Sequence, residues 1–170
     1  MTHFVGIDTL EIYCFNEIKE DITMSAKENE VLTRKIFEIF NSVQGNTVKL
    51  KTATWDTIFS PDYIIHFTNR DMNLEQFIQY NAALFTAFPD SCFTIDDMIV
   101  AADKVITRYT LRGTHQKEYM GMAPTGKQIA VKGISIDRFS KGKDVETWDF
   151  PDTLGAMMQL GAIPTPPSGK

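Results

Sequence analysis

Residues 128–150 read QIAVKGISIDRFSKGKDVETWDF, and this stretch decides the fold. Apolar residues alternate with polar ones and predict a strand from Gln128 to Phe139. Ser140-Lys-Gly-Lys143 has the composition of a tight hairpin turn. A second strand is predicted from Asp144 to Phe150, because Pro151 stops it. The stretch is therefore predicted to form a long antiparallel hairpin.

The same two-residue period governs the sequence just upstream. It begins near Cys92 and continues to Ile99, where apolar side chains alternate with polar ones. A turn is predicted at Ala101–Lys104, and the alternation then resumes from Val105 to Thr114. The second half of the chain is thus predicted to be a run of hairpins.

The first half shows the period of amphipathic helices instead. Apolar residues at helical spacing predict a first helix from about Ala26 to Ser42, and Ser25-Ala-Lys-Glu28 has the pattern of a capping box at its start. Asn73-Leu-Glu-Gln76 is a second start signal, for a helix that ends at Pro89. Three smaller elements are predicted as well: a helix from Thr52 to Phe59, a strand from Tyr63 to Phe67 and a helix from Thr153 to Leu160.

Helices followed by hairpins predict an α+β fold, with the helices on one face of a mostly antiparallel sheet. A length of 170 residues suits one domain. We place it at residues 25–164, between an N-terminal extension of residues 1–24 and a C-terminal tail of residues 165–170. Met98, Ile134 and Ile136 fall on the other face of the sheet. An apolar second face on a small sheet predicts a homodimer or a higher homo-oligomer.

Composition excludes several classes of partner. Hydrophobic residues make up 43% and charged residues 23% of the chain, as in folded globular proteins. A net charge of −5 leaves no basic surface, so nucleic acid and anionic membranes are not expected partners. With no apolar run of about 20 residues and no signal-peptide pattern, we expect a cytoplasmic protein. Cys14 and Cys92 make no disulfide framework and are expected to be reduced and buried.

Two apparent motifs predict no site. Gly121-Met-Ala-Pro-Thr-Gly-Lys-Gln128 comes close to the phosphate-binding loop, but Gln128 stands where a hydroxyl residue would hold magnesium. It also lies between two predicted strands, so we interpret it as a hairpin turn. His3, His66 and His115 are far apart and lack the spacing of a metal site. The sequence therefore predicts neither a nucleotide nor a metal.

Several ordered motifs remain, and together they resemble one family. They are Ala87-Phe-Pro-Asp90, Arg112-Gly-Thr-His115, Gly121-Met-Ala-Pro-Thr-Gly126 and residues 142–161, which read GKDVETWDFPDTLGAMMQLG. Over roughly residues 28–164 the chain is similar to the SnoaL-like polyketide cyclase (ester cyclase) family. The resemblance implies a cone-shaped α+β barrel of the nuclear-transport-factor-like superfamily. In that fold, N-terminal helices pack into a strongly curved sheet around a deep apolar pocket.

The resemblance also implies a chemistry. Characterised members close the last ring of aromatic polyketide esters by intramolecular aldol condensation, without a metal or other cofactor. An aspartate on their final strand acts as general acid and base, and a match without gaps places it at Asp149; a pocket histidine falls at His115. A carbon acid flanked by carbonyls needs only a base within reach and a wall that fixes the electrophile. Burial in an apolar cavity makes a carboxylate a stronger base.

Other residues are candidates for substrate binding. Members often carry a polar pocket residue at the position of His66, and a second acidic position falls at Asp152, which also fits a helix N-cap. The characterised cyclase has a histidine where this chain has Ser135, which can hydrogen-bond but cannot share proton transfer. Four further residues are expected in the pocket wall, with plain core packing as the alternative: Phe88, Tyr119, Met122 and Trp148.

Three functions remain open at this point. The first is a cofactor-independent cyclase, isomerase or related hydrolase that acts on a small apolar carbonyl compound. The second is a protein that holds a hydrophobic ligand in the same pocket without chemistry. The third is a dimerisation domain whose pocket is filled by its own side chains. Fold alone does not choose among them.

Overall fold

The computed structural model describes residues 9–164, with side chains from residue 26 onward. Five helical segments are present: α1 (Thr9–Val43), α2 (Val48–Thr52), a 3₁₀ turn (Trp55–Thr57), α3 (Leu74–Ala87) and α4 (Thr153–Leu160). Six strands complete the described fold: β1 (Phe59–Phe67), β2 (Arg70–Asn73), β3 (Cys92–Ala101), β4 (Lys104–Thr114), β5 (Gln128–Ser140) and β6 (Lys143–Pro151).

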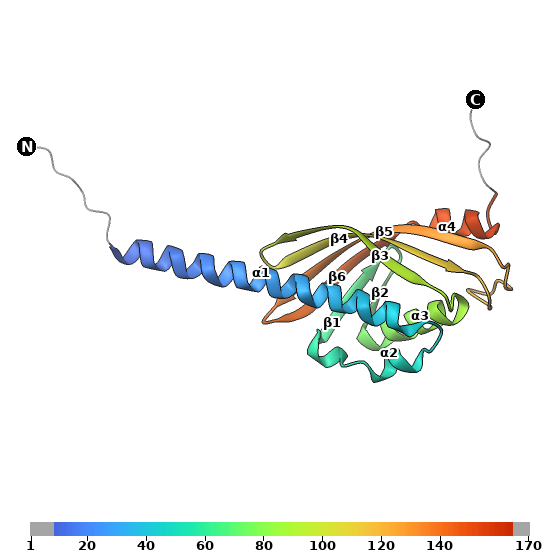
Figure 1. The fold of residues 1–170 in the computed structure, drawn as a ribbon, viewed down its shortest axis with the longest axis horizontal. Helices are drawn as coiled ribbons and strands as arrows, with labels where there is room; N and C mark the ends of the chain where they lie inside the picture. The colour runs from blue at the N-terminus through green and yellow to red at the C-terminus, as the bar shows by residue number, and fades with distance from the viewer. Residues whose placement is uncertain (1–8, 165–170) are drawn as a thin grey trace, which may run out of the picture.

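The strands form one curved sheet in the order β2-β1-β6-β5-β4-β3. Neighbouring strands are antiparallel, except that β1 runs parallel to β6. The sheet bends over α1 and α3, while α4 lies beside β5 at one end (Figure 1). The predicted α+β fold, with helices against a mostly antiparallel sheet, is confirmed.

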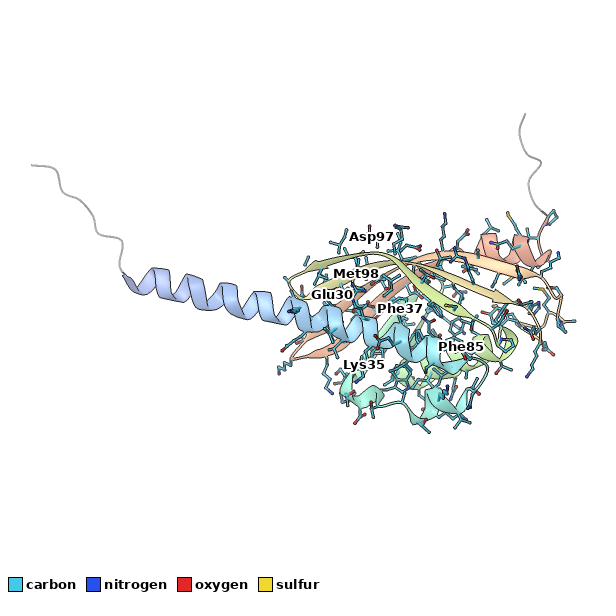
Figure 2. All side chains as sticks on the ribbon, in the orientation of Figure 1. Glu30, Lys35, Phe37, Phe85, Asp97 and Met98 are labelled. Atoms are coloured by element: carbon cyan, nitrogen blue, oxygen red, sulfur yellow. The ribbon has the colours of Figure 1, made fainter. Side chains whose placement is uncertain are left out.

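Aromatic side chains form the core where α1 and α3 pack against the sheet. The ring of Phe40 lies 5.6 Å from that of Phe85 and 5.5 Å from that of Phe93, measured between centroids. Figure 2 shows Phe85 in this layer together with Phe37. The side chain of Asn41 accepts a hydrogen bond from the Phe93 amide at 2.7 Å and donates one to its carbonyl at 2.9 Å. These contacts fasten α1 to β3.

The start of α1 differs from the prediction. The helix begins at Thr9 and not near Ala26, so Ser25 lies inside the helix and is not its N-cap. The physical reason is that residues 9–43 contain neither glycine nor proline to end a helix. Residues 9–24 of the predicted extension therefore form the first part of α1. Residues 1–8 and the tail of residues 165–170 lie outside the described residues. Within residues 9–164, no helix is both long and apolar enough to cross a membrane.

Smaller corrections concern the segment before β1 and the cysteines. The predicted helix from Thr52 to Phe59 is reduced to the 3₁₀ turn Trp55–Thr57, since α2 ends at Thr52 and β1 begins at Phe59. The buried indole of Trp55 donates to the Leu50 carbonyl, which fixes a tight turn between α2 and the 3₁₀ turn and prevents a longer helix. Cys92 is exposed at the start of β3, contrary to expectation, while the side chain of Cys14 lies outside the described residues. The short strand β2 was not predicted.

The face of the sheet turned away from the helices carries a row of apolar side chains. The register places Ile99, Ile106, Ile136 and Trp148 side by side on four neighbouring strands. Next to this row, Ile134 and Phe150 pair directly and are 45% and 51% exposed. The predicted apolar second face is thus present. Met98, which was predicted on this outer face, is the exception. A register shift between Ile95 and Asp97 pairs it with the buried Thr107 and places it on the inner face.

Replacing Asn73 by alanine should lower the free energy of unfolding by about 1 kcal/mol. The Asn73 side chain accepts a hydrogen bond from the Gln76 amide, and the Gln76 side chain accepts one from the Asn73 amide, both at 3.0 Å. Urea unfolding followed by circular dichroism measures the change. Asn46→Ala is the control, at an exposed position whose side chain makes no hydrogen bond within the described region. An equal loss in both variants would contradict the capping assignment.

Candidate active site

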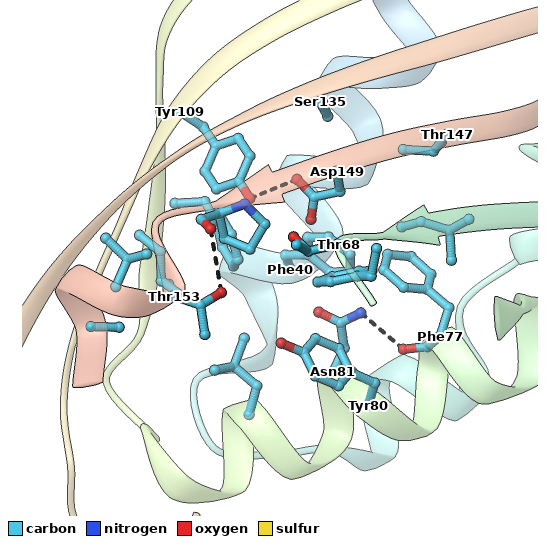
Figure 3. Close-up of a pocket in the computed structure, with 18 of the residues that line it drawn as sticks. Phe40, Thr68, Phe77, Tyr80, Asn81, Tyr109, Ser135, Thr147, Asp149 and Thr153 are labelled. Carbon is cyan, nitrogen blue, oxygen red and sulfur yellow. Dashed lines mark hydrogen bonds between the residues drawn. The ribbon is translucent and has the colours of Figure 1, made fainter. Parts of the chain in front are cut away.

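A cavity of about 650 Å³ lies between the helices and the inner face of the sheet. Its wall is mostly apolar, with aromatic and aliphatic side chains from α1, α3, α4 and the strands (Figure 3). Polar groups reach it from several elements, and three of its aspartates come from β5 and β6. This space is open, so the protein does not fill its own pocket with side chains. A purely structural dimerisation domain was expected to have a filled pocket, and the cavity argues against that hypothesis.

The carboxyl group of Asp149 points into this cavity from β6 (Figure 3). The Tyr109 hydroxyl donates a hydrogen bond to its Oδ1 at 2.8 Å. Among the described residues, no lysine, arginine or histidine forms a salt bridge with Asp149. Burial raises the pKa of Asp149 to about 7, although the hydrogen bond from Tyr109 lowers it. The group can therefore both take and release a proton near neutral pH.

The Tyr109 ring owes its position to Gly133. The two residues pair directly on β4 and β5. A Cβ atom at position 133 would lie 2.8 Å from Cε2 of Tyr109, and closer still to the hydroxyl end of the ring. Glycine thus leaves room for Tyr109 to reach across β5 to Asp149 on β6. On its other side the ring contacts Phe37 and Phe93, with centroids 5.9 and 5.7 Å away.

Two more aspartates lie further along the same sheet face, Asp137 on β5 and Asp144 on β6. The hydroxyl oxygen of Thr147 is 3.0 Å from a carboxyl oxygen of Asp137 and 3.3 Å from one of Asp144. Burial raises the pKa of Asp137 to about 7. Burial, with the charge of Asp137 added, raises the pKa of Asp144 well above its usual range. The cavity therefore holds three carboxyl groups whose charged forms are disfavoured.

The wall across the cavity from Asp149 comes from α3. Asn81 lies there (Figure 3) and donates a hydrogen bond to the Phe77 carbonyl at 2.9 Å. The hydroxyls of Tyr80 and Tyr119 are 3.5 Å apart, and the Arg70 guanidinium lies 5.3 Å from the Tyr80 ring. Sequence reasoning missed Asn81, although a polar residue one turn after Phe77, on the apolar stripe of the helix, was a usable signal.

Five of the predicted site residues line the cavity. Ser135 pairs directly with Asp149 across β5 and β6. Asp152 accepts a hydrogen bond from the Gly155 amide at 2.8 Å, so its interpretation as the N-cap of α4 is confirmed. The five residues are Phe88, Tyr119, Ser135, Asp149 and Asp152.

His66 and Trp148 lie on the opposite face of the sheet. Trp148 alternates with Asp149 along β6, and its ring stacks on that of His66 with centroids 5.3 Å apart. His66 is 2.8 Å from Asp71 and 3.0 Å from Glu146, and hydrogen bonds to these two carboxylates raise its pKa. Neither side chain lines the cavity, in contrast to the expectation, because strand alternation turns both outward.

His115 and Met122 also lie outside the cavity wall. His115 is fully buried, its ring stacks on Phe88 at 5.2 Å, and its Nδ1 accepts a hydrogen bond from the Thr125 amide at 3.3 Å. Met122 packs against the same apolar cluster as Phe88. His115 therefore joins the loop of residues 115–127 to the core and does not face Asp149. The acid/base role that the resemblance implied for it has no support in this placement.

Besides Asn81, three further residues of the site were not predicted. Asp137 shares a strand face with Ser135, and Tyr109 shares one with the apolar Val105 and Leu111, so strand alternation was a usable signal for both. Asp144 is different, because the register between β5 and β6 shifts next to it and leaves Val145 unpaired. The shift turns Asp144, in place of Val145, into the core. No pattern in the sequence marks that shift.

Comparison with known proteins identifies relatives of this chain. Residues 41–160 match the family model for SnoaL-like polyketide cyclase. The aklanonic acid methyl ester cyclase AcmA from Streptomyces galilaeus is 42% identical over 60 residues. That match covers 35% of this chain and 42% of the length of AcmA, so it extends over less than half of either protein.

Solved structures agree with the family model. AclR from Streptomyces galilaeus, a candidate hydroxylase, is 25% identical with a TM-score of 0.71, over 84% of this chain and 86% of its own. IdmH from Streptomyces antibioticus, a candidate polyketide cyclase, is 27% identical with a TM-score of 0.65, over 78% of this chain and 98% of its own. These likenesses confirm the cone-shaped fold. Since the family model also spans most of the described chain, the protein belongs to the SnoaL-like polyketide cyclase family.

Proposed function

We propose that this protein is a cofactor-independent enzyme of the cyclase or isomerase type, with Asp149 as its general acid and base. The observation that carries the proposal is the carboxyl group of Asp149 in an apolar cavity, held by Tyr109 and without a basic partner in the described part of the chain. A carboxyl group placed in this way has a pKa matched to proton transfer at neutral pH. Family membership supports the same chemistry.

The proposed reaction is an intramolecular aldol condensation or a related isomerisation. Asp149 takes a proton from a carbon next to a carbonyl group, so that the C–H bond breaks and an enolate forms. The enolate carbon attacks a second carbonyl of the same molecule, a C–C bond forms, and the resulting alkoxide takes the proton back from Asp149. Tyr109 keeps the Asp149 carboxylate oriented during the first step. The apolar walls hold the two reacting groups together and exclude water.

The cavity favours an apolar carbonyl compound with ring systems as the substrate. Its volume of about 650 Å³ falls in the range of small-molecule sites, and its aromatic walls suit flat rings. The relative AcmA is named for the methyl ester of aklanonic acid. That ester is therefore a suitable probe for the activity of this protein.

Replacing Asp149 by asparagine should lower turnover of aklanonic acid methyl ester by about 10²–10⁴-fold while leaving the fold intact. Asparagine has the same shape but cannot take the proton. Two measurements apply: ring closure by chromatography, and hydrogen–deuterium exchange at the acidic carbon of recovered ester in D₂O by mass spectrometry. Both should be fast with the wild type and slow with the variant.

The control is Asp103→Asn, the same chemical change in the exposed turn between β3 and β4. It should keep wild-type exchange and closure. If Asp149→Asn also kept them, the assignment of the base would be wrong. If the wild type bound the ester but neither exchanged nor closed it, the protein would be a binding module and not an enzyme.

Replacing Tyr109 by phenylalanine should move the pH profile of exchange to higher pH by about 1 unit. The hydrogen bond from Tyr109 stabilises the charged form of Asp149 and lowers its pKa, so its loss raises the pKa above about 7. Because the base acts in its charged form, exchange rises with pH through this pKa, and the midpoint should follow it upward. A midpoint that moved down, or did not move, would contradict the role of Tyr109.

We also propose that two copies of this chain pair through the outer sheet face. Ile134 and Phe150 are exposed there beside the row of Ile99, Ile106, Ile136 and Trp148, and burying such an apolar patch against its own copy is favourable.

The double variant Ile134→Lys, Phe150→Lys should be a monomer in sedimentation velocity at micromolar concentration, where the wild type is a dimer. Two lysines on each copy would place like charges in the interface. Val48→Lys, at an exposed position on α2, is the control and should remain dimeric. A monomeric wild type would contradict the proposal.

A further inference from the structure

Asp137, Thr147 and Asp144 form a buried group that the function proposed above does not use. The Thr147 hydroxyl contacts one oxygen of each carboxyl group, at 3.0 and 3.3 Å. A hydroxyl has one hydrogen and can donate to only one carboxylate at a time. The other contact then needs a hydrogen on the carboxyl side. The geometry therefore indicates that the two aspartates hold one proton between them.

The surroundings of the two aspartates also indicate that they share one proton. Both aspartates are buried, and neither takes part in an ion pair within residues 26–164. Two adjacent buried carboxylates without a counter-ion are strongly disfavoured, and one of them then stays protonated. The raised pKa values of Asp137 and Asp144 agree with this.

Two buried hydroxyls without partners lie near this group, and one of them, that of Thr33, faces the cavity where a ligand would bind. Thr33 and Thr107 are fully buried, and their hydroxyls have no hydrogen-bond partner in the described structure. Thr33 lines the cavity. On α1 it lies between Asn29, which contacts Ala102, and Phe37, which contacts Tyr109, so it faces the part of β4 that contains Thr107. A buried hydroxyl without a partner is unfavourable unless a bound molecule satisfies it.

The distance from this group to Asp149 suits one reacting molecule. Ser135 pairs with Asp149 and Asp137 pairs with Thr147, so Asp137 and Asp149 are diagonal neighbours on one face of the sheet. Such neighbours have Cα atoms about 7–8 Å apart. Both carboxyl groups line the cavity. A carbon acid beside Asp149 and a carbonyl oxygen beside Asp137 can therefore belong to the same bound molecule.

We propose that Asp137 is a second catalytic residue, which gives the proton shared with Asp144 to the carbonyl oxygen under attack while Asp149 takes the proton from carbon. This inference rests on the proposed function and divides its two proton transfers between two groups.

The C–H electrons form the new C–C bond, the electron pair of the C=O π bond moves to oxygen, and that oxygen takes the proton of the aspartate pair. Asp149 then carries a proton that it did not have before, and the pair has lost one. Release of the Asp149 proton to water and uptake of one by the pair restore the starting state, so no oxidant, reductant or other co-reactant is needed.

Replacing Asp137 by asparagine should separate the two assays with aklanonic acid methyl ester. Ring closure should fall by about 10²–10⁴-fold, because the acid is missing. Hydrogen–deuterium exchange at carbon should stay close to the wild-type rate, because Asp149 is intact. Asp149→Asn should lose both, and Asp103→Asn should lose neither.

The outcomes distinguish the two proposals. If Asp137→Asn closes the ring at the wild-type rate, Asp137 is not the acid, although Asp149 remains the base. If Asp149→Asn keeps both rates, the proposed function itself fails.

A second measurement does not depend on the folding of the Asp137 variant. In Asp149→Asn at neutral pH, the infrared spectrum should contain the carbonyl stretch of one protonated carboxyl group from the pair. Asp144→Asn in the same background should change that band and, with Asp149 restored, should slow closure but not exchange. A spectrum without a protonated carboxyl group would overturn the inference.

Discussion

Antiparallel pairing between β5 and β6 places Ser135 opposite Asp149 and Asp137 opposite Thr147. The side chains of directly paired residues point to the same side of a sheet, so this register alone brings the polar groups of the cavity together. A slip of β6 by one residue would turn Thr147 and Asp149 outward and bring Trp148 and Phe150 inward in their place. The core, the cavity and the arrangement of its carboxyl groups all depend on that one alignment.

The carboxyl groups that this register buries also oppose folding. Asp137 and Asp149 have pKa values raised to about 7, above the value of roughly 4 expected in an unfolded chain. A group whose pKa is raised on folding favours the folded state when protonated, at low pH, and that contribution is lost as the pH rises through the folded value. Near neutral pH the domain therefore retains groups that weaken it. Such a placement is common at sites of proton transfer and rare elsewhere in a core.

Much of the fold was predictable because local signals are strong where they exist. The capping box at Asn73, the turn at residues 140–143 and the bounds of α4 all follow from short-range chemistry. Two features could not be predicted in this way. The start of α1 was placed too late because residues 9–25 contain no glycine or proline that would separate them from the helix, and the parallel pairing of β1 with β6 depends on residues far apart in the chain. In the site, Asp149 was identified through family motifs, but Asp144 was not, because it depends on a register shift that no residue type announces.

The glycine beneath the Tyr109 ring has a consequence for the evolution of this pocket. A Cβ atom at position 133 would occupy the volume of the Tyr109 ring, so Gly133 cannot gain a side chain while Tyr109 is present. A relative with a side chain at position 133 must carry a smaller residue at position 109 and must orient its aspartate by another group. Covariation between these two columns, across homologous sequences, would therefore divide the family into members that position their aspartate with a phenol and members that do not.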